Sequence, residues 1–246
     1  MTGPTTCALA RSELRLFLRE PANLLAGVVL PSALLAGLGT VPALREPSAA
    51  FGGRAFLTVF APSLLAVSVA VLGLQVLPVG LASYREKGVL RRLAVTPVSP
   101  VAVLVAQLAI TLAAATAGTL LLVGVAVLGV GLPAPRHPLG LAAAYAVGTG
   151  AVFAVGLVVA AVAPRARAAS AVGTVLLVLS QFFAGVYLPT FLLPDVVVRV
   201  GAYVPPGVAA FSAAWLGAGP PAGPLLAMAA LAVAGTALAA RVFRWQ

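Results

Sequence analysis

Charged side chains are scarce in this sequence. Only 8% of its 246 residues are Asp, Glu, Lys or Arg, whereas a soluble domain carries about 25%, and 62% of the residues are hydrophobic. So few charges cannot cover the surface of a soluble fold of this length, which excludes most soluble enzymes and binding domains. We therefore predict an all-α integral membrane protein.

Acidic residues are scarcer than basic ones, with five Asp and Glu against fifteen Lys and Arg and a net charge of +10. In a soluble protein this balance would favour nucleic acid as a partner, but in a membrane protein it is typical of basic cytoplasmic loops and of contact with anionic lipid. We expect the lipid bilayer as a partner and no nucleic acid. Lys87 is the single lysine, which is typical of a high-GC bacterial genome, so we expect the bacterial cytoplasmic membrane.

The residues that carry most enzyme chemistry are nearly absent. Cys7 is the only cysteine, which excludes an internal disulfide, and His137 is the only histidine, so we expect no metal site. A phosphate-binding loop needs a lysine directly after a glycine, but Lys87 follows Glu86. We predict that this chain is not an enzyme, hydrolyses no nucleotide and binds no cofactor of its own.

The long apolar runs predict six membrane spans, because each is long enough to cross a hydrocarbon core that takes about 20 helical residues. They cover residues 23–44, 56–82, 101–128, 139–163, 168–188 and 224–240.

None of these runs holds an Asp, Glu, Lys, Arg or His, which argues against a proton antiporter and an intramembrane hydrolase. Their most polar residues, Gln75, Gln107 and Gln181, are expected to make hydrogen bonds between helices, with Gln181 facing a substrate as the alternative. The candidate substrate path consists of Gln75, Gln181, Phe182 and Phe183.

Two further segments depart from the simple spans. Residues 5–20 predict an amphipathic helix in the membrane interface, unless they form a loose cytosolic tail. Its basic and apolar stripes comprise Arg11, Leu14, Arg15, Phe17 and Leu18. Residues 189–221 are apolar but broken by prolines, which predicts a re-entrant helical hairpin that returns to the same side, or an ordinary external loop.

Six spans place both termini on one side of the membrane, and the cations favour that side. It would hold Arg11, Arg15, Arg19, Arg85, Lys87, Arg91, Arg92, Arg165, Arg167, Arg241 and Arg244, whereas the opposite side would hold Arg45, Arg54, Arg136 and Arg199. Because basic residues stay in the cytoplasm, we expect both termini to be cytoplasmic.

The densest charge lies between the second and third spans. Residues 84–95 predict a short surface helix with the five charges of Arg85, Glu86, Lys87, Arg91 and Arg92 beside apolar side chains, and Pro97 follows it. We interpret this helix as a docking element for a soluble partner.

The same stretch carries a resemblance. Arg85-Glu86-Lys87-Gly88-Val89-Leu90-Arg91-Arg92-Leu93 and Thr96-Pro97-Val98-Ser99-Pro100 resemble the cytoplasmic segment of type-2 ABC transporter permeases. Phe183 to Pro189, Leu193-Pro194, Pro205-Pro206 and the Arg241-Val242-Phe243-Arg244-Trp245 ending are similar to later parts of that family. The chain is most similar to the daunorubicin-exporter-like, multidrug-resistance branch, with residues 1–246 forming one transmembrane domain.

The resemblance implies two permease subunits, identical or not, and two separate ATPase subunits that bind ATP and Mg²⁺. It also implies that the helix at 84–95 is a coupling helix seated on the ATPase, which the helix at 5–20 touches as well. The coupling residues would be Arg85, Glu86, Gly88, Val89, Leu90, Arg91, Arg92 and Leu93. For Glu86 the alternative is a solvated partner of neighbouring Arg or Lys side chains.

The expected function is therefore outward movement of a hydrophobic or amphiphilic compound, such as a drug, an antibiotic or a lipid-like molecule. Export of a polysaccharide or another polymer by the same family is an alternative, as is a membrane scaffold or assembly factor that transports nothing. A passive channel would need a polar or charged ring along its pore, which the spans do not offer.

Overall fold

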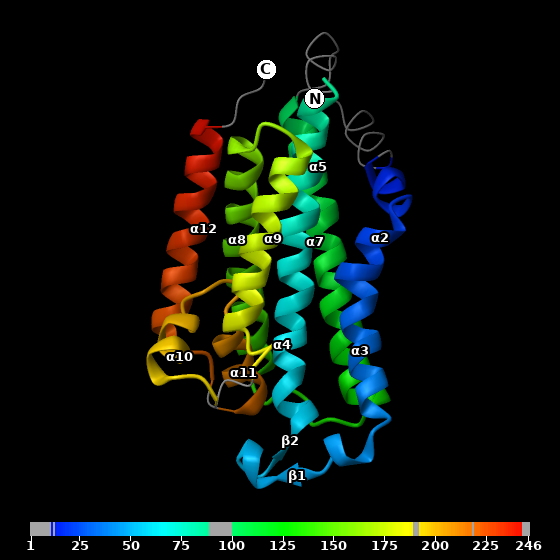
Figure 1. Ribbon diagram of the computed structural model, residues 1–246, viewed down its shortest axis with the longest axis vertical. Helices are drawn as coiled ribbons and strands as arrows, with labels where there is room; N and C mark the ends of the chain where they lie inside the picture. The colour runs from blue at the N-terminus through cyan, green and yellow to red at the C-terminus, as the bar shows by residue number, and fades with distance from the viewer. Residues whose placement is uncertain (1–10, 12, 89–99, 189–191, 218, 243–246) are drawn as a thin grey trace.

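The computed structural model describes residues 11, 13–88, 100–188, 192–217 and 219–242. Six of its helices are long and apolar enough to cross a membrane, and they stand side by side in one bundle (Figure 1). The all-α membrane fold with six spans is confirmed. Residues 13–18, which are helical, and the end of the last span lie at the same end of the bundle.

The first span is built from α2 (Pro21–Leu24), the π-helical turn η1 (Leu25–Val29) and α3 (Leu30–Gly39). It ends at Gly39 rather than at the predicted residue 44, because Pro42 opens a separate 3-10 turn, η2 (Pro42–Leu44). A proline removes the hydrogen bond to the carbonyl four residues earlier and displaces that carbonyl. For Pro31 that carbonyl belongs to Gly27, and it accepts a hydrogen bond of 2.5 Å from Ser68 Oγ.

The second span is the central one and repeats this pattern. It consists of α4 (Phe56–Val71), the π-helical turn η4 (Leu72–Val76) and α5 (Leu77–Glu86). Pro62 lies inside α4 without ending it, whereas Pro78 follows the π turn directly. Nearly the whole of α4 is buried, with Leu57, Leu64, Leu65 and Val69 almost completely covered by the surrounding helices.

Two neighbouring helices touch the backbone of η4. A Cβ atom on Gly156 of α8 would lie 2.0 Å from the Gly73 carbonyl oxygen, and one on Gly173 of α9 would lie 2.1 Å from that of Leu74. Both helices therefore approach the central span at positions where only glycine fits. This contact fixes α8 and α9 against the second span at mid-height.

The remaining spans run close to their predicted ranges. They are α7 (Pro100–Gly124), which continues into the π-helical turn η5 (Val125–Gly129), then α8 (Pro138–Val162), α9 (Ala166–Phe183) and α12 (Ala222–Val242). α9 ends at Phe183, five residues before the predicted residue 188. Gly185, two residues after this end, adopts a left-handed φ of +71°.

The end opposite to residues 13–18 carries the other short elements (Figure 1). β1 (Pro47–Ser48) and β2 (Arg54–Ala55) form a minimal antiparallel pair around η3 (Ala49–Phe51). In the segment predicted to re-enter the membrane, α10 (Asp195–Gly201) is mostly exposed. In contrast, α11 (Val208–Leu216) packs on α4 and α8 and buries Phe211 and Trp215. Residues 189–191 of this segment lie outside the described residues.

Candidate functional site

The charged segment after the second span starts differently from the prediction. Tyr84, Arg85 and Glu86 are the last residues of α5, so they do not open a separate helix over 84–95. The helix ends at Glu86, and Gly88 just after it has a φ of +67° and donates its N–H to the Arg85 carbonyl at 3.0 Å. The predicted coupling residues Val89, Leu90, Arg91, Arg92 and Leu93 lie outside the described residues.

Arg85 binds the end of another span. Its Nη1 donates to the Ala161 carbonyl at 3.2 Å, and its Nη2 donates to the Ala163 carbonyl. These carbonyls lie at the C-terminus of α8, where the last turn of a helix has acceptors without helical partners and a partial negative charge. A guanidinium group satisfies both needs.

Glu86 binds the beginning of the next helix, α9. Its Oε2 accepts the Ala166 N–H at 3.0 Å, at the first residue of α9, where N–H groups lack partners and the helix dipole is positive. Two adjacent residues of opposite charge thus hold both helix ends of the turn formed by residues 163–165. We call this pair the Arg85–Glu86 clamp. The structure gives Glu86 this backbone partner, while Arg91 and Arg92, two of the neighbouring cations considered from the sequence, lie outside the described residues.

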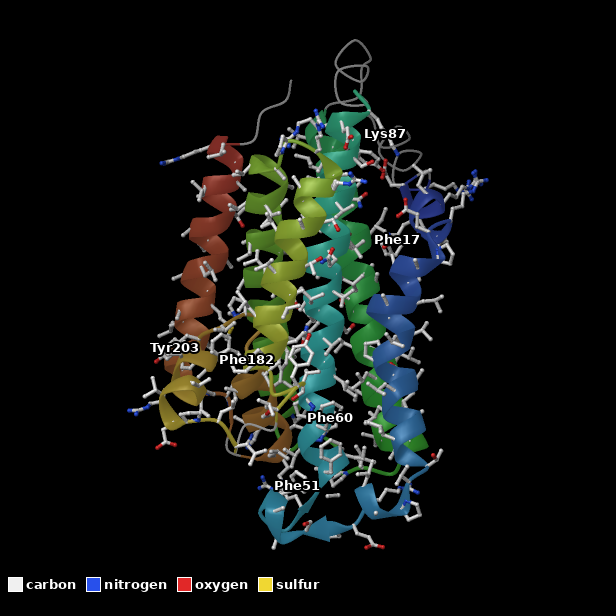
Figure 2. All side chains as sticks on the ribbon, viewed as in Figure 1. Phe17, Phe51, Phe60, Lys87, Phe182 and Tyr203 are labelled. Atoms are coloured by element: carbon white, nitrogen blue, oxygen red, sulfur yellow. The ribbon has the colours of Figure 1, made fainter. Side chains whose placement is uncertain are left out.

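The N-terminal segment joins the same place through Glu13. This carboxylate is only 7% exposed and accepts a hydrogen bond of 2.6 Å from the Tyr84 hydroxyl. Phe17, which is labelled in Figure 2, is buried in the same hydrophobic cluster as Leu72 and Val76 of the central span. The other predicted residues of the interface helix, Arg11, Leu14, Arg15 and Leu18, are exposed. Sequence reasoning missed Glu13. The feature that could have identified it is an acidic residue on a helix that is otherwise basic and apolar.

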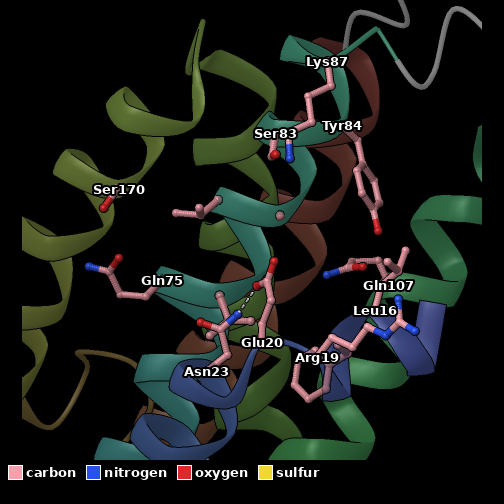
Figure 3. A pocket seen from close by; sticks show the side chains of 14 residues that line it. Leu16, Arg19, Glu20, Asn23, Gln75, Ser83, Tyr84, Lys87, Gln107 and Ser170 are labelled. Atoms are coloured by element: carbon pink, nitrogen blue, oxygen red, sulfur yellow. Dashed lines mark hydrogen bonds between the residues drawn. The ribbon is translucent and has the colours of Figure 1, made fainter.

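A polar cavity of about 470 Å³ opens between this segment, α5, α7 and α9. Figure 3 shows Ser83, Tyr84 and Lys87 on α5, Gln107 on α7 and Ser170 on α9 around it. Glu20, in the same wall, accepts a hydrogen bond of 2.6 Å from Asn23 Nδ2. The Gln107 side chain passes so close to α5 that a Cβ on Gly80 would lie 2.9 Å from its Nε2.

The predicted substrate path is distributed over two places. Gln75 lines the polar cavity, and its Nε2 donates to Thr174 Oγ1 on α9 at 2.7 Å, as expected of a hydrogen bond between helices. Gln181, Phe182 and Phe183 are not among the residues that line this cavity. Gln181 is buried, and neither polar atom of its amide has a partner among the described residues. Phe182 and Phe183 make an edge-to-face contact with centroids 5.4 Å apart.

The site is therefore a mechanical junction. The end of the second span is joined by side chains to α8, to α9 and to the N-terminal segment, all at the end where the chain leaves α5 for residues 89–99 (Figures 1 and 2). A displacement of this end would move several spans together, because packed helices shift as rigid bodies. Within the described ranges, no three His, Cys, Asp or Glu side chains gather so as to hold a metal ion.

Comparison with known families gives one match. A family model described as ABC-2 type transporter matches residues 4–216, which include five of the six spans and the whole junction. No curated protein and no solved structure matches the chain.

Proposed function

Because this chain belongs to the family of ABC-2 type transporters and is a multi-pass permease subunit, we propose that it exports a hydrophobic or amphiphilic compound. Energy comes from ATP hydrolysed by a separate ABC ATPase subunit, since the sequence has no phosphate-binding loop. The cargo class is that of a drug, an antibiotic or a lipid-like molecule. A second permease subunit completes the transport path.

The observation that carries this proposal is the Arg85–Glu86 clamp. It lies at the base of residues 89–99, which follow α5 and carry the motif that resembles a coupling segment. An ATPase that pushes on this segment moves α5, and the clamp passes the movement to the ends of α8 and α9. Energy thus reaches three spans from one cytoplasmic contact.

The cargo class is supported by the character of the bundle. Its spans hold long apolar surfaces, while the cavity beside α5 offers the amide of Gln107 and the hydroxyls of Ser83 and Ser170. A molecule with an apolar body and a polar head fits both environments. The second permease is supported by α9, on which Val172, Val175 and Leu179 are 46%, 59% and 50% exposed at helical spacing.

The direct test is Leu90→Asp, a change that places a charge in the contact with the ATPase. Burying an unpaired charge is costly, so we expect normal membrane insertion but loss of ATPase stimulation and of export. Export can be followed with a fluorescent anthracycline in inverted vesicles that contain both subunits. Leu90→Met is the control, since it keeps an apolar side chain of similar size. Unchanged export and unchanged ATPase co-purification in Leu90→Asp would exclude this coupling segment.

The orientation needs its own test. With both termini in the cytoplasm, Ser48 faces the outside, because it lies in the loop at the opposite end of the bundle. In a Cys7→Ala background, we expect Ser48→Cys to react with an impermeant thiol reagent in intact cells, and Ala94→Cys to react only after lysis. Labelling of Ala94→Cys in intact cells would contradict the proposed orientation.

A further inference from the structure

A second cavity, of about 490 Å³, lies at the end of the bundle opposite to the junction. Three separate parts of the chain form it: the loop between the first two spans, the loop between η5 and α8, and the end of α11. Three arginines line it, namely Arg45, Arg54 and Arg136. Four arginines are assigned to this side of the membrane by the sequence, and three of them converge here.

No carboxylate of the described residues neutralises the three guanidinium groups. Arg45 donates from Nη2 to the Val130 carbonyl, and Arg136 packs its Cδ against Gly217, where a Cβ would lie 2.6 Å away. Among the described residues, no carboxylate forms a hydrogen bond or an ion pair with any of the three side chains. Glu46 is adjacent to Arg45 in the sequence but does not line the cavity. Like charges gathered in a concave site repel one another, and an anion relieves this repulsion.

Two buried polar groups belong to the same wall. Trp215 is only 1% exposed, and its indole Nε1 has no hydrogen-bond partner among the described residues. Thr58, in the first turn of α4, is 8% exposed and lines the cavity as well. Trp215 therefore lies in the wall of the cavity, where its indole emission can report what binds there.

We propose that this cavity binds a phosphate group. Each arginine offers a planar fork of N–H donors that matches two oxygens of a phosphate, and three forks from two loops match a tetrahedral anion better than a flat carboxylate. The cavity lies where the spans end, so both a phospholipid headgroup and a dissolved phosphate can reach it. The two sources share this chemistry.

Arg199 provides the matched control for a general effect of surface charge. It lies on α10 at the same end and is exposed, but it does not line the cavity. Its Nε donates to the Asp195 carbonyl at 3.4 Å within its own helix. If exposed arginines merely attract anions, removing Arg199 must weaken binding as much as removing Arg54.

The test uses the full chain with Trp245→Phe, in lipid nanodiscs of phosphatidylcholine. The sequence has two tryptophans, so Trp215 then reports alone. In one arm, inorganic phosphate is titrated at constant ionic strength. In the other arm, phosphatidylglycerol replaces phosphatidylcholine stepwise. Trp215 emission and the thermal unfolding temperature are followed in both.

We expect a saturable change in at least one arm. Saturation by inorganic phosphate identifies a free anion, and saturation by phosphatidylglycerol alone identifies a headgroup. The double variant Arg54→Gln/Arg136→Gln should weaken binding about tenfold or more, whereas Arg199→Gln should leave it unchanged. If the glutamine variant does not fold, Arg54→Lys/Arg136→Lys keeps the charge but loses the forks, and should weaken binding about threefold or more.

No saturable response by either measure in either arm would overturn the proposal. So would an Arg199→Gln variant that binds as weakly as the double variant. Because neither measurement involves transport or the ATPase, the outcome is independent of the proposed export.

Discussion

The two ends of the bundle use arginine in opposite ways. At the junction, Arg85 is bound to the carbonyls that end α8, and Glu86 beside it binds the first N–H of α9. At the other end, Arg54 and Arg136 face a cavity, and no carboxylate pairs with either among the described residues. The difference lies in the groups that each arginine finds nearby.

Free helix ends decide which use an arginine has. The turn at residues 163–165 presents a negative and a positive helix end next to each other, so a pair of opposite charges holds it closed. Between the loops at 45–54 and 130–136, only one arginine side chain donates to a backbone carbonyl, from Arg45 to Val130. The charges of Arg85 and Glu86 are therefore bound to helix ends, whereas no carboxylate of the described residues pairs with Arg54 or Arg136.

Exchanging the charges of the clamp should have the largest effect. The double variant Arg85→Glu/Glu86→Arg preserves net charge but points a carboxylate at carbonyl groups and a guanidinium at N–H groups. We expect loss of export and a stability decrease of about 2 kcal/mol or more, measured by thermal unfolding in detergent. If the double variant kept both export and stability, the two side chains would act only on each other and not on the ends of α8 and α9.

A milder change separates charge from hydrogen bonding at the same place. Glu86→Gln keeps an acceptor for the Ala166 N–H but removes the negative charge from the N-terminus of α9. We expect a stability decrease of about 0.5–1 kcal/mol and partial loss of ATPase-coupled export. Glu46→Gln, at the other end, is the control and should change neither quantity. An equal loss in both variants would show that position 86 is not special.

The smallest effect is expected from the opposite end. In buffer free of phosphate, Arg54→Gln/Arg136→Gln should change the stability by less than about 0.5 kcal/mol, or raise it, because like charges are removed. Export should be retained. A marked destabilisation, again followed by thermal unfolding, would mean that these arginines hold the loops together as Arg85 holds the α8–α9 turn.

The six spans could be predicted from the sequence because each predicted range is a long apolar run without Asp, Glu, Lys, Arg or His. The π-helical turns within these spans could not be predicted. Pro31 and Pro78 are visible in the sequence, but the π turns before them depend on where the displaced carbonyls find partners, such as Ser68 for Gly27. The need for glycine at positions 156 and 173 likewise could not be predicted, because it depends on the backbone that these residues touch in the fold.

The junction shows a second limit of sequence reasoning. The charges and apolar residues of 84–95 favoured a separate helix, yet Tyr84, Arg85 and Glu86 continue the second span because nothing interrupts it before Gly88. The partners of Arg85 and Glu86 lie about eighty residues away along the chain, at helix ends that carry no side-chain signature. The arginine cavity is hidden for the same reason, since Arg45 and Arg54 come from the loop between the first two spans and Arg136 comes from the loop before α8.

The π turn η4 has a consequence for how this chain can change by insertion and deletion. A π turn amounts to one extra residue in an α-helix, and each residue turns an α-helix by about 100°. Deleting one residue between Leu72 and Val76 would leave the apolar composition of the span almost unchanged, but it would rotate everything after it, including Arg85 and Glu86, away from the α8–α9 turn. The rotational position of Arg85 and Glu86 about the helix axis is thus set ten residues earlier in the chain, inside the membrane. We therefore expect relatives that share the clamp to keep the length of this segment even where its residues differ.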